Sequence, residues 1–122
     1  MEQFITTFSA IPGKEDAVTE FYLRLQPEYD KAKGFHGRRI YRARPGTMVN
    51  ALRKVMTPEQ MAQHPEPADD GSIHFIIVEK WDSIEDRMAF SASQDKSRNA
   101  ELFPNLLPEH SHEYYDDITP DS

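Results

Sequence analysis

One carboxylate of the chain lies within a run of bulky apolar residues and could take part in proton transfer. A period of two in the segment Ser72–Trp81 puts Glu79 on the same face as three apolar residues, Phe75, Ile77 and Trp81. Burial among apolar side chains raises the pKa of a carboxyl group, so Glu79 could act as a general base. A nearby arginine would instead make it half of a structural ion pair. The sequence leaves both alternatives open.

Two tyrosines and a basic strand could hold a ligand in place. The hydroxyl groups of Tyr22 and Tyr41 could orient a phenolic or carboxylate ligand, although tyrosines also pack at the boundary of a core. Arg38, Arg42 and Arg44 share one face of an expected strand. One of these guanidinium groups could bind a ligand carboxylate in the bidentate manner typical of arginine.

Three histidines require a separate interpretation. His110 and His112 are two residues apart in an expected strand, so both point the same way and could chelate a divalent cation. No third ligand is evident in the sequence, and a solvated strand edge explains the pair better. We therefore predict no metal site. His74 lies on the opposite face from Trp81 and is expected to point toward the sheet interior or a partner.

The composition excludes several classes of protein. The 122 residues predict one domain, 1–122, and the absence of cysteine excludes thiolate catalysis, iron–sulfur clusters and disulfides. No glycine-rich phosphate loop supports a nucleotide-dependent activity. We expect a cytoplasmic protein with no membrane partner, because no apolar run approaches the roughly 20 residues of a membrane span.

The charge is unevenly distributed along the chain. The net charge is −7, yet residues 24–54 hold nine Lys or Arg and only two acids. Basic residues interleaved with Tyr41 superficially suit single-stranded nucleic acid. Because such binding depends on neutralising phosphates and the rest of the chain is acidic, we expect no nucleic-acid partner.

The positions of these residues depend on the elements that carry them. Apolar patterning predicts strands over Met1–Ile11, Phe35–Arg44, Ser72–Trp81 and His110–Ile118. The run from Phe75 to Val78 is bulky enough to be buried on both faces at the sheet centre. A helix should begin near Lys14, with a kink or a new first turn at Pro27 and a C-cap at Gly34.

Further helices are expected in the second half of the chain. Residues 45–71 look like an insertion, with one helix over Met48–Met56, a capping box at Thr57–Gln60 and a loop over 64–71. The apolar side of this insertion, with Met48, Leu52 and Met56, could close a pocket or cover a sheet edge. Ser83 should cap a helix that carries Ile84, Met88 and Ala92. A second helical piece begins near Gln94 and is closed by Pro104 and Pro108, and an acidic tail occupies about 117–122.

The order β-α-β-(insertion)-β-α-β predicts an α+β fold of the ferredoxin-like type. In that fold the first and third strands lie at the centre of a four-stranded antiparallel sheet. The edge strands would be the second, which is basic, and the fourth, which is acidic. Since unpaired edges must be covered or paired, we expect a homodimer in which these edges lie near each other.

Three short motifs resemble the antibiotic biosynthesis monooxygenase (ABM) superfamily of dimeric α/β-barrel proteins. They are Pro12-Gly13-Lys14, Gly34-Phe35-His36-Gly37 and Val78-Glu79-Lys80-Trp81-Asp82-Ser83. The resemblance covers nearly the whole chain and implies a pocket between the helices and the Trp81 face of the third strand. Family members that oxidise phenolic polyketides typically have an asparagine where this chain has Ile77. Haem-degrading relatives typically have a histidine ligand where it has Ser91.

The resemblance implies a protein that binds a small aromatic or polyketide-like molecule. We predict a cofactor-independent monooxygenase or related enzyme in biosynthesis, with the alternative of a non-catalytic dimeric module. The predicted catalytic residues are Glu79 and Tyr22, and a histidine could also deprotonate a phenol. The predicted ligand-binding residues are Trp81, Phe75, Ile77, Tyr41 and Arg38. No cofactor is expected.

Overall fold

A four-stranded antiparallel sheet forms the body of the protein. The computed structural model describes residues 1–63 and 69–121. The strands are β1 (Glu2–Ala10), β2 (Phe35–Arg42), β3 (Ile73–Trp81) and β4 (Leu106–Tyr115), in the order β2-β3-β1-β4. The expected ferredoxin-like arrangement is therefore confirmed, with β1 and β3 central and β2 and β4 at the edges.

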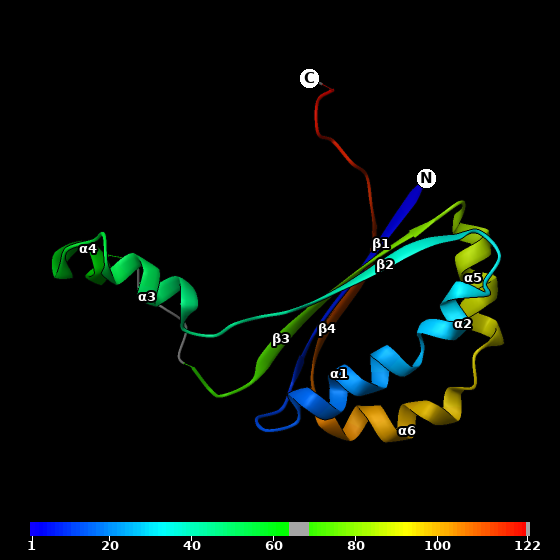
Figure 1. Ribbon diagram of the computed structural model, residues 1–122, viewed down its shortest axis with the longest axis horizontal. Coiled ribbons are helices and arrows are strands. Elements are labelled where there is room, and N and C mark those ends of the chain that lie inside the picture. Colours follow the sequence, from blue (N-terminus) through cyan, green and yellow to red (C-terminus); the bar gives the residue numbers. More distant parts are fainter. Residues whose placement is uncertain (64–68, 122) are drawn as a thin grey trace.

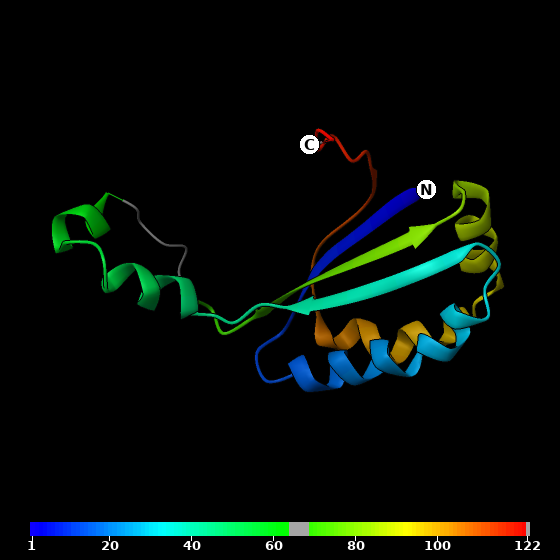
Figure 2. The same cartoon turned by 45° about the horizontal axis from the view of Figure 1, so that its top comes forward.

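Helices cover one face of this sheet. They are α1 (Glu15–Arg24), α2 (Gln26–Asp30), α5 (Ile84–Ser93) and α6 (Asn99–Leu102), with short 3-10 turns η1 (Lys96–Arg98) and η2 (Phe103–Asn105) (Figures 1 and 2). The new helical turn expected at Pro27 is confirmed, because Pro27 lies in the first turn of α2, where its missing N–H costs nothing. None of these helices, nor any other in the described ranges, is long and apolar enough to cross a membrane.

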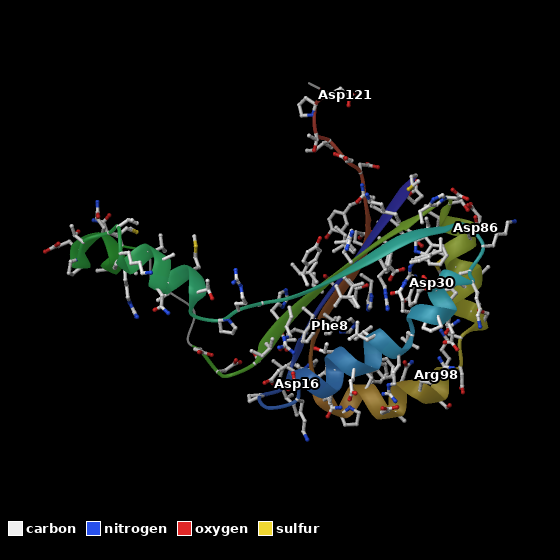
Figure 3. The ribbon with its side chains drawn as sticks, viewed as in Figure 1. Phe8, Asp16, Asp30, Asp86, Arg98 and Asp121 are labelled. Carbon is white, nitrogen blue, oxygen red and sulfur yellow. The ribbon has the colours of Figure 1, made fainter. Side chains whose placement is uncertain are left out.

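The alternation of β1 and β3 divides the sheet into a covered and an uncovered face. Phe4, Phe8 and Ala10 of β1 are buried on the helix side together with four residues of β3, which are Phe75, Ile77, Glu79 and Trp81. Figure 3 shows Phe8 between the sheet and α1. The prediction that β3 is buried on both faces is wrong for a single chain. Ile76 is 37% exposed because the helices lie on one face only.

Two predicted element boundaries are wrong. Gly34 is not the C-cap of α2, which ends at Asp30. It has a left-handed backbone (φ 82°) before β2, and an added Cβ would clash with the Asp86 side chain. Pro108 does not close the helical segment but lies inside β4, which begins at Leu106. The edge strand tolerates this proline next to a bulge in its pairing with β1, between Phe8 and Ala10.

The predicted insertion forms a helical arm. α3 (Thr47–Arg53) and α4 (Pro58–Ala62) extend beyond the end of the sheet where β2 ends and β3 begins (Figures 1 and 2). The capping box is confirmed, since Thr57 Oγ1 accepts a hydrogen bond from Gln60 N and the Gln60 side chain accepts one from Thr57 N. None of the residues of α3 and α4 is buried. Most of the loop expected over 64–71 falls on residues 64–68, which lie outside the described residues.

Candidate functional site

Glu79 lies at the centre of a buried polar cluster. Its Oε1 accepts hydrogen bonds from Trp81 Nε1 at 2.9 Å and from Arg87 Nε at 3.1 Å. Tyr29 donates to Oε2 at 3.5 Å. The structure thus supplies the arginine of the ion-pair alternative, Arg87 on α5. Both carboxylate oxygens are already engaged, which leaves Glu79 little freedom to approach a ligand.

An aromatic cluster surrounds this pair. The ring of Trp81 lies 5.3–6.3 Å from those of Phe35, Tyr29 and Phe90. Trp81 and Phe75 are completely buried. Neither is among the residues that line the two cavities between the sheet and the helices, and their burial places these two predicted ligand-binding residues in the core. Burial and the nearby Glu79 carboxylate raise the pKa of Tyr29 to about 12, so its hydroxyl remains a hydrogen-bond donor.

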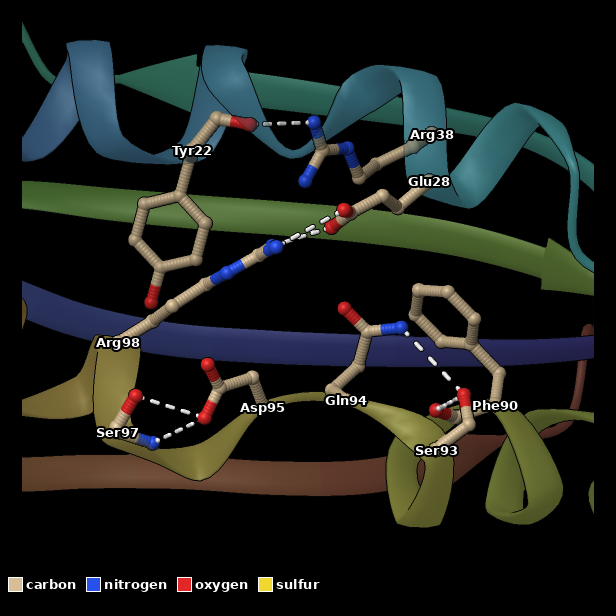
Figure 4. A network of polar contacts seen from close by, with 9 residues as sticks. All are labelled: Tyr22, Glu28, Arg38, Phe90, Ser93, Gln94, Asp95, Ser97 and Arg98. Atoms are coloured by element: carbon tan, nitrogen blue, oxygen red, sulfur yellow. Dashed lines mark hydrogen bonds and ion pairs between the residues drawn. The ribbon is translucent and has the colours of Figure 1, made fainter.

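α5 turns its polar side toward the sheet, which opens a cavity. The expected apolar stripe points outward, and Met88 is 52% exposed. Arg87, Phe90, Ser91 and Gln94 face inward instead and line a cavity of about 220 Å³ together with Glu79, Lys96 and Arg98. We call this cavity the polar lobe. Arg98 reaches across it to pair with Glu28 of α2, and Gln94, Asp95 and Tyr22 border the same space (Figure 4).

A second cavity of about 430 Å³ adjoins the polar lobe. We call it the apolar lobe because its wall is largely hydrophobic, with Phe8, Leu102, Phe103, Leu106, Leu107 and Pro108. Five residues line both cavities: Thr6, Tyr22, Asn99, Leu102 and His112. The two lobes therefore meet along the sheet face under α1 and α6, and form one elongated site with a polar and an apolar end.

Tyr22 lies where the lobes meet. Its ring stacks on Phe8 with centroids 5.1 Å apart. Burial raises the pKa of Tyr22, with a further contribution from Tyr29, so the hydroxyl stays protonated near neutral pH and can donate a hydrogen bond. This predicted catalytic residue thus lies in the cavity. Ile77 also lines it, in the polar lobe.

The structure does not bring Arg38 and Tyr41 to this site. Arg38 donates through Nη2 to the Tyr22 carbonyl oxygen at 2.7 Å and to Gln26, and its guanidinium group stacks over Tyr29 (Figure 4). It lines neither lobe, so it positions α1 against the sheet. Tyr41 is 56% exposed on the uncovered face. His74 lies on that same face, as expected, and is within 3.1 Å of Ser9 Oγ.

His110 and His112 lie at the mouth of the site. In the β1–β4 ladder they pair with Phe8 and Thr6, so both rings belong to the covered face. Both line the apolar lobe, and their ring centroids are 5.1 Å apart. Burial, His110 and Arg87 lower the pKa of His112, which favours the neutral imidazole. Within the described ranges no three His, Asp or Glu residues are grouped so that they could hold a metal ion.

Sequence reasoning missed Arg87, Tyr29 and the role of the two histidines as cavity residues. For the histidines, their spacing of two puts both rings on one face, but only the pairing of β4 with β1 shows that this is the covered face. Arg87 could not be identified, because the amphipathic pattern of α5 predicts the opposite side of the helix as the buried one.

Comparisons with known proteins show the fold but not the family. No family model matches the chain, and no curated protein sequence matches it significantly. Its structure resembles that of a protein described as an antibiotic biosynthesis monooxygenase, at 14% identity over 98% of this chain and 100% of that one (TM-score 0.62). A protein of unknown function from Nitrosomonas europaea is 13% identical over 99% of this chain and 92% of that one (TM-score 0.64).

Another similar structure is that of an oxygenase. SnoaB from Streptomyces nogalater, described as a cofactor-independent oxygenase, is 13% identical over 98% of both chains (TM-score 0.55). The chain therefore has the fold expected from the resemblance to antibiotic biosynthesis monooxygenases.

Proposed function

We propose that this protein belongs with the antibiotic biosynthesis monooxygenases and binds a small aromatic or polyketide-like molecule in the two joined lobes. The observation that carries the proposal is the pair of adjoining cavities, with five lining residues in common, between the covered sheet face and the helices α1, α5 and α6. Together the lobes fall within the range of about 300–1,000 Å³ typical of ligand pockets. Phe8 and Tyr22 contribute aromatic side chains to the wall, which suits a planar aromatic ligand.

The proposed chemistry is oxygenation without a bound cofactor, or a related rearrangement. An electron-rich phenol becomes reactive toward O₂ once a base removes its proton, so the protein must supply a proton acceptor and orient the ring. Ile77 stands where the phenol-oxidising relatives have asparagine. The protonated hydroxyl of Tyr22 and that of Thr6 border the cavity and could stabilise the oxyanion instead.

The presence of isoleucine at position 77, in place of the asparagine, also favours a second candidate function. Without the asparagine, the same cavity would serve a non-catalytic module that binds a metabolite or partner. Oxygen uptake separates the two functions. With a panel of planar phenols and no added cofactor, the enzyme consumes O₂ above the uncatalysed rate. Binding of a panel member without oxygen consumption would contradict catalysis.

We also propose that the protein is a homodimer. The uncovered sheet face carries several apolar side chains, among them Ile5, Ile76 and Val78. The two edges differ in charge, with Arg39 and Arg42 on β2 and Glu109 and Glu113 on β4. A second copy would cover the apolar face and bring edges of opposite charge together.

A further inference from the structure

We propose that His110 is the group that accepts the proton of a phenolic hydroxyl bound in the apolar lobe. The inference rests on the proposed function and assigns its proton-transfer step to one atom, Nε2 of His110. The ring lies on the covered face of β4, opposite Phe8, and lines the apolar lobe. A phenol bound in the apolar lobe would therefore share its cavity with this imidazole.

The hydrogen bond of the other ring nitrogen decides the tautomer. His110 Nδ1 lies 2.9 Å from the carbonyl oxygen of Pro108. A carbonyl oxygen only accepts, so Nδ1 must carry the proton and donate it. The neutral ring then has its lone pair on Nε2, as a proton acceptor requires. The same bond fixes the orientation of the ring relative to the strand.

The other titratable groups are poorer acceptors. His112 and Tyr22 are the remaining titratable residues of the apolar lobe, and no carboxylate or cation lines it in the described part of the chain. Tyr22 is held in its protonated form by burial. Glu79 lies in the polar lobe and is engaged by Trp81, Arg87 and Tyr29.

His112 is disfavoured by its surroundings. Desolvation and the charges of His110 and Arg87 lower its pKa, and Glu79 opposes them more weakly. The lobe that His110 lines is also lined by Phe8 and Thr6 of β1, Tyr22 of α1, and Asn99 and Leu102 of α6. Of these, Tyr22 alone is titratable, and it is neutral. These observations leave His110 as the candidate proton acceptor among the residues that line the apolar lobe.

The step is balanced without an oxidant. The O–H bond of the phenol breaks, both electrons stay on oxygen, and the proton forms a new N–H bond at His110 Nε2. The products are a phenolate and an imidazolium. Because His110 is exposed at the mouth of the lobe, the imidazolium can return its proton to water.

A coloured phenol tests the assignment directly. 4-Nitrophenol absorbs in the visible range only as the phenolate, and 4-nitroanisole has the same ring but no proton to lose. At a pH below the pKa of free nitrophenol, we expect the bound probe to be ionised severalfold more than the free probe. His110→Gln should lower this ionised fraction at least fivefold, while its affinity for nitroanisole stays within twofold. His74→Gln makes the same substitution on the uncovered face and should change neither.

The outcomes separate this inference from the proposed function. Unchanged ionisation in His110→Gln, or loss of ionisation in His112→Gln but not in His110→Gln, overturns the role of His110. If His110→Gln weakens the binding of nitrophenol and nitroanisole equally, His110 has a packing role, and its role as proton acceptor is overturned as well. If the wild-type protein binds neither nitroanisole nor any planar phenol, the proposed function itself fails.

Discussion

The structure changes the interpretation of Glu79 from a possible general base to one partner of a buried ion pair. The sequence allows a general base or an ion pair, and the geometry shows a carboxylate held by Trp81 Nε1 and Arg87 Nε. A buried pair contributes little net stability, yet loss of one partner leaves the other charge unpaired. Glu79 then holds Arg87 at the wall of the polar lobe, which both side chains line.

Glu79→Gln should therefore act on stability. We expect a loss of roughly 3–5 kcal/mol in the free energy of unfolding, measured by urea titration, because Arg87 stays buried without its partner. The double variant Glu79→Gln, Arg87→Met should recover part of this loss. A Glu79→Gln protein as stable as the wild type but inactive would identify Glu79 as a catalytic base.

Tyr29 gives a pH dependence with a defined sign. Its pKa is about 12 in the folded protein, against 10.0 ordinarily. A group whose pKa is raised on folding contributes its full stabilisation below the unfolded value and loses it as the pH rises toward the folded value. The free energy of unfolding should therefore fall between about pH 10 and pH 12, by on the order of 2 kcal/mol from Tyr29.

The comparison with Tyr29→Phe isolates this contribution from other groups that titrate at high pH. The variant should lose less stability over the same range, as followed by circular dichroism in urea. Parallel pH curves for the two proteins would show that ionisation of Tyr29 does not oppose folding.

At the scale of elements, α5 explains why a cavity exists. Its sequence pattern favours burial of Ile84, Met88 and Ala92, but packing buries the opposite side. Phe90 makes aromatic contacts with Tyr29 and Trp81 at 4.6 and 5.4 Å, and Arg87 is bound to Glu79. These contacts outweigh the amphipathic pattern. Short polar residues such as Ser91 then face the sheet and leave space.

The orientation of α5 can be tested by a pair of substitutions. Met88→Lys should change the free energy of unfolding by less than about 0.5 kcal/mol, because the side chain is already half exposed. Phe90→Ala should cost roughly 3 kcal/mol, since it removes an aromatic side chain that packs against two others. Thermal or urea unfolding of both variants measures the contrast, and the reverse order would mean that α5 is turned the other way.

Sequence patterns predicted the elements better than their packing. The order of strands, the break at Pro27 and the capping residues Thr57 and Ser83 follow from local rules of turns and caps, and all are confirmed. The start of β4 at Leu106 could not be predicted from such local rules. Pro108 is a local signal against a strand, and only the bulge opposite Ser9 allows this proline inside β4. The cavity depends on the rotation of α5 and on where β4 begins, so local sequence rules could not predict it.

At the scale of the whole molecule, the uncovered face of the sheet predicts self-association. We expect light scattering at micromolar concentration to give twice the 14.1 kDa mass of the chain. Ile76→Glu should dissociate the dimer, because it puts a charge at the centre of the apolar face. Ile84→Glu makes the same change on the outer side of α5 and should leave the dimer intact. A wild-type protein that is monomeric under these conditions would exclude the proposal.

The central claim is that the joined lobes bind a planar aromatic molecule, and blocking their junction tests it most directly. Asn99 of α6 lines both lobes, so Asn99→Phe should fill the space between them. The measurement is a titration with planar phenols, followed through the fluorescence of Trp81, which is linked to the polar lobe through Glu79.

We expect saturable binding by the wild type, binding at least tenfold weaker by Asn99→Phe, and no change in Asn50→Phe, which makes the same substitution on the exposed arm. Equal affinities for the wild type and Asn99→Phe would contradict the account, because the ligand would then occupy some other part of the molecule.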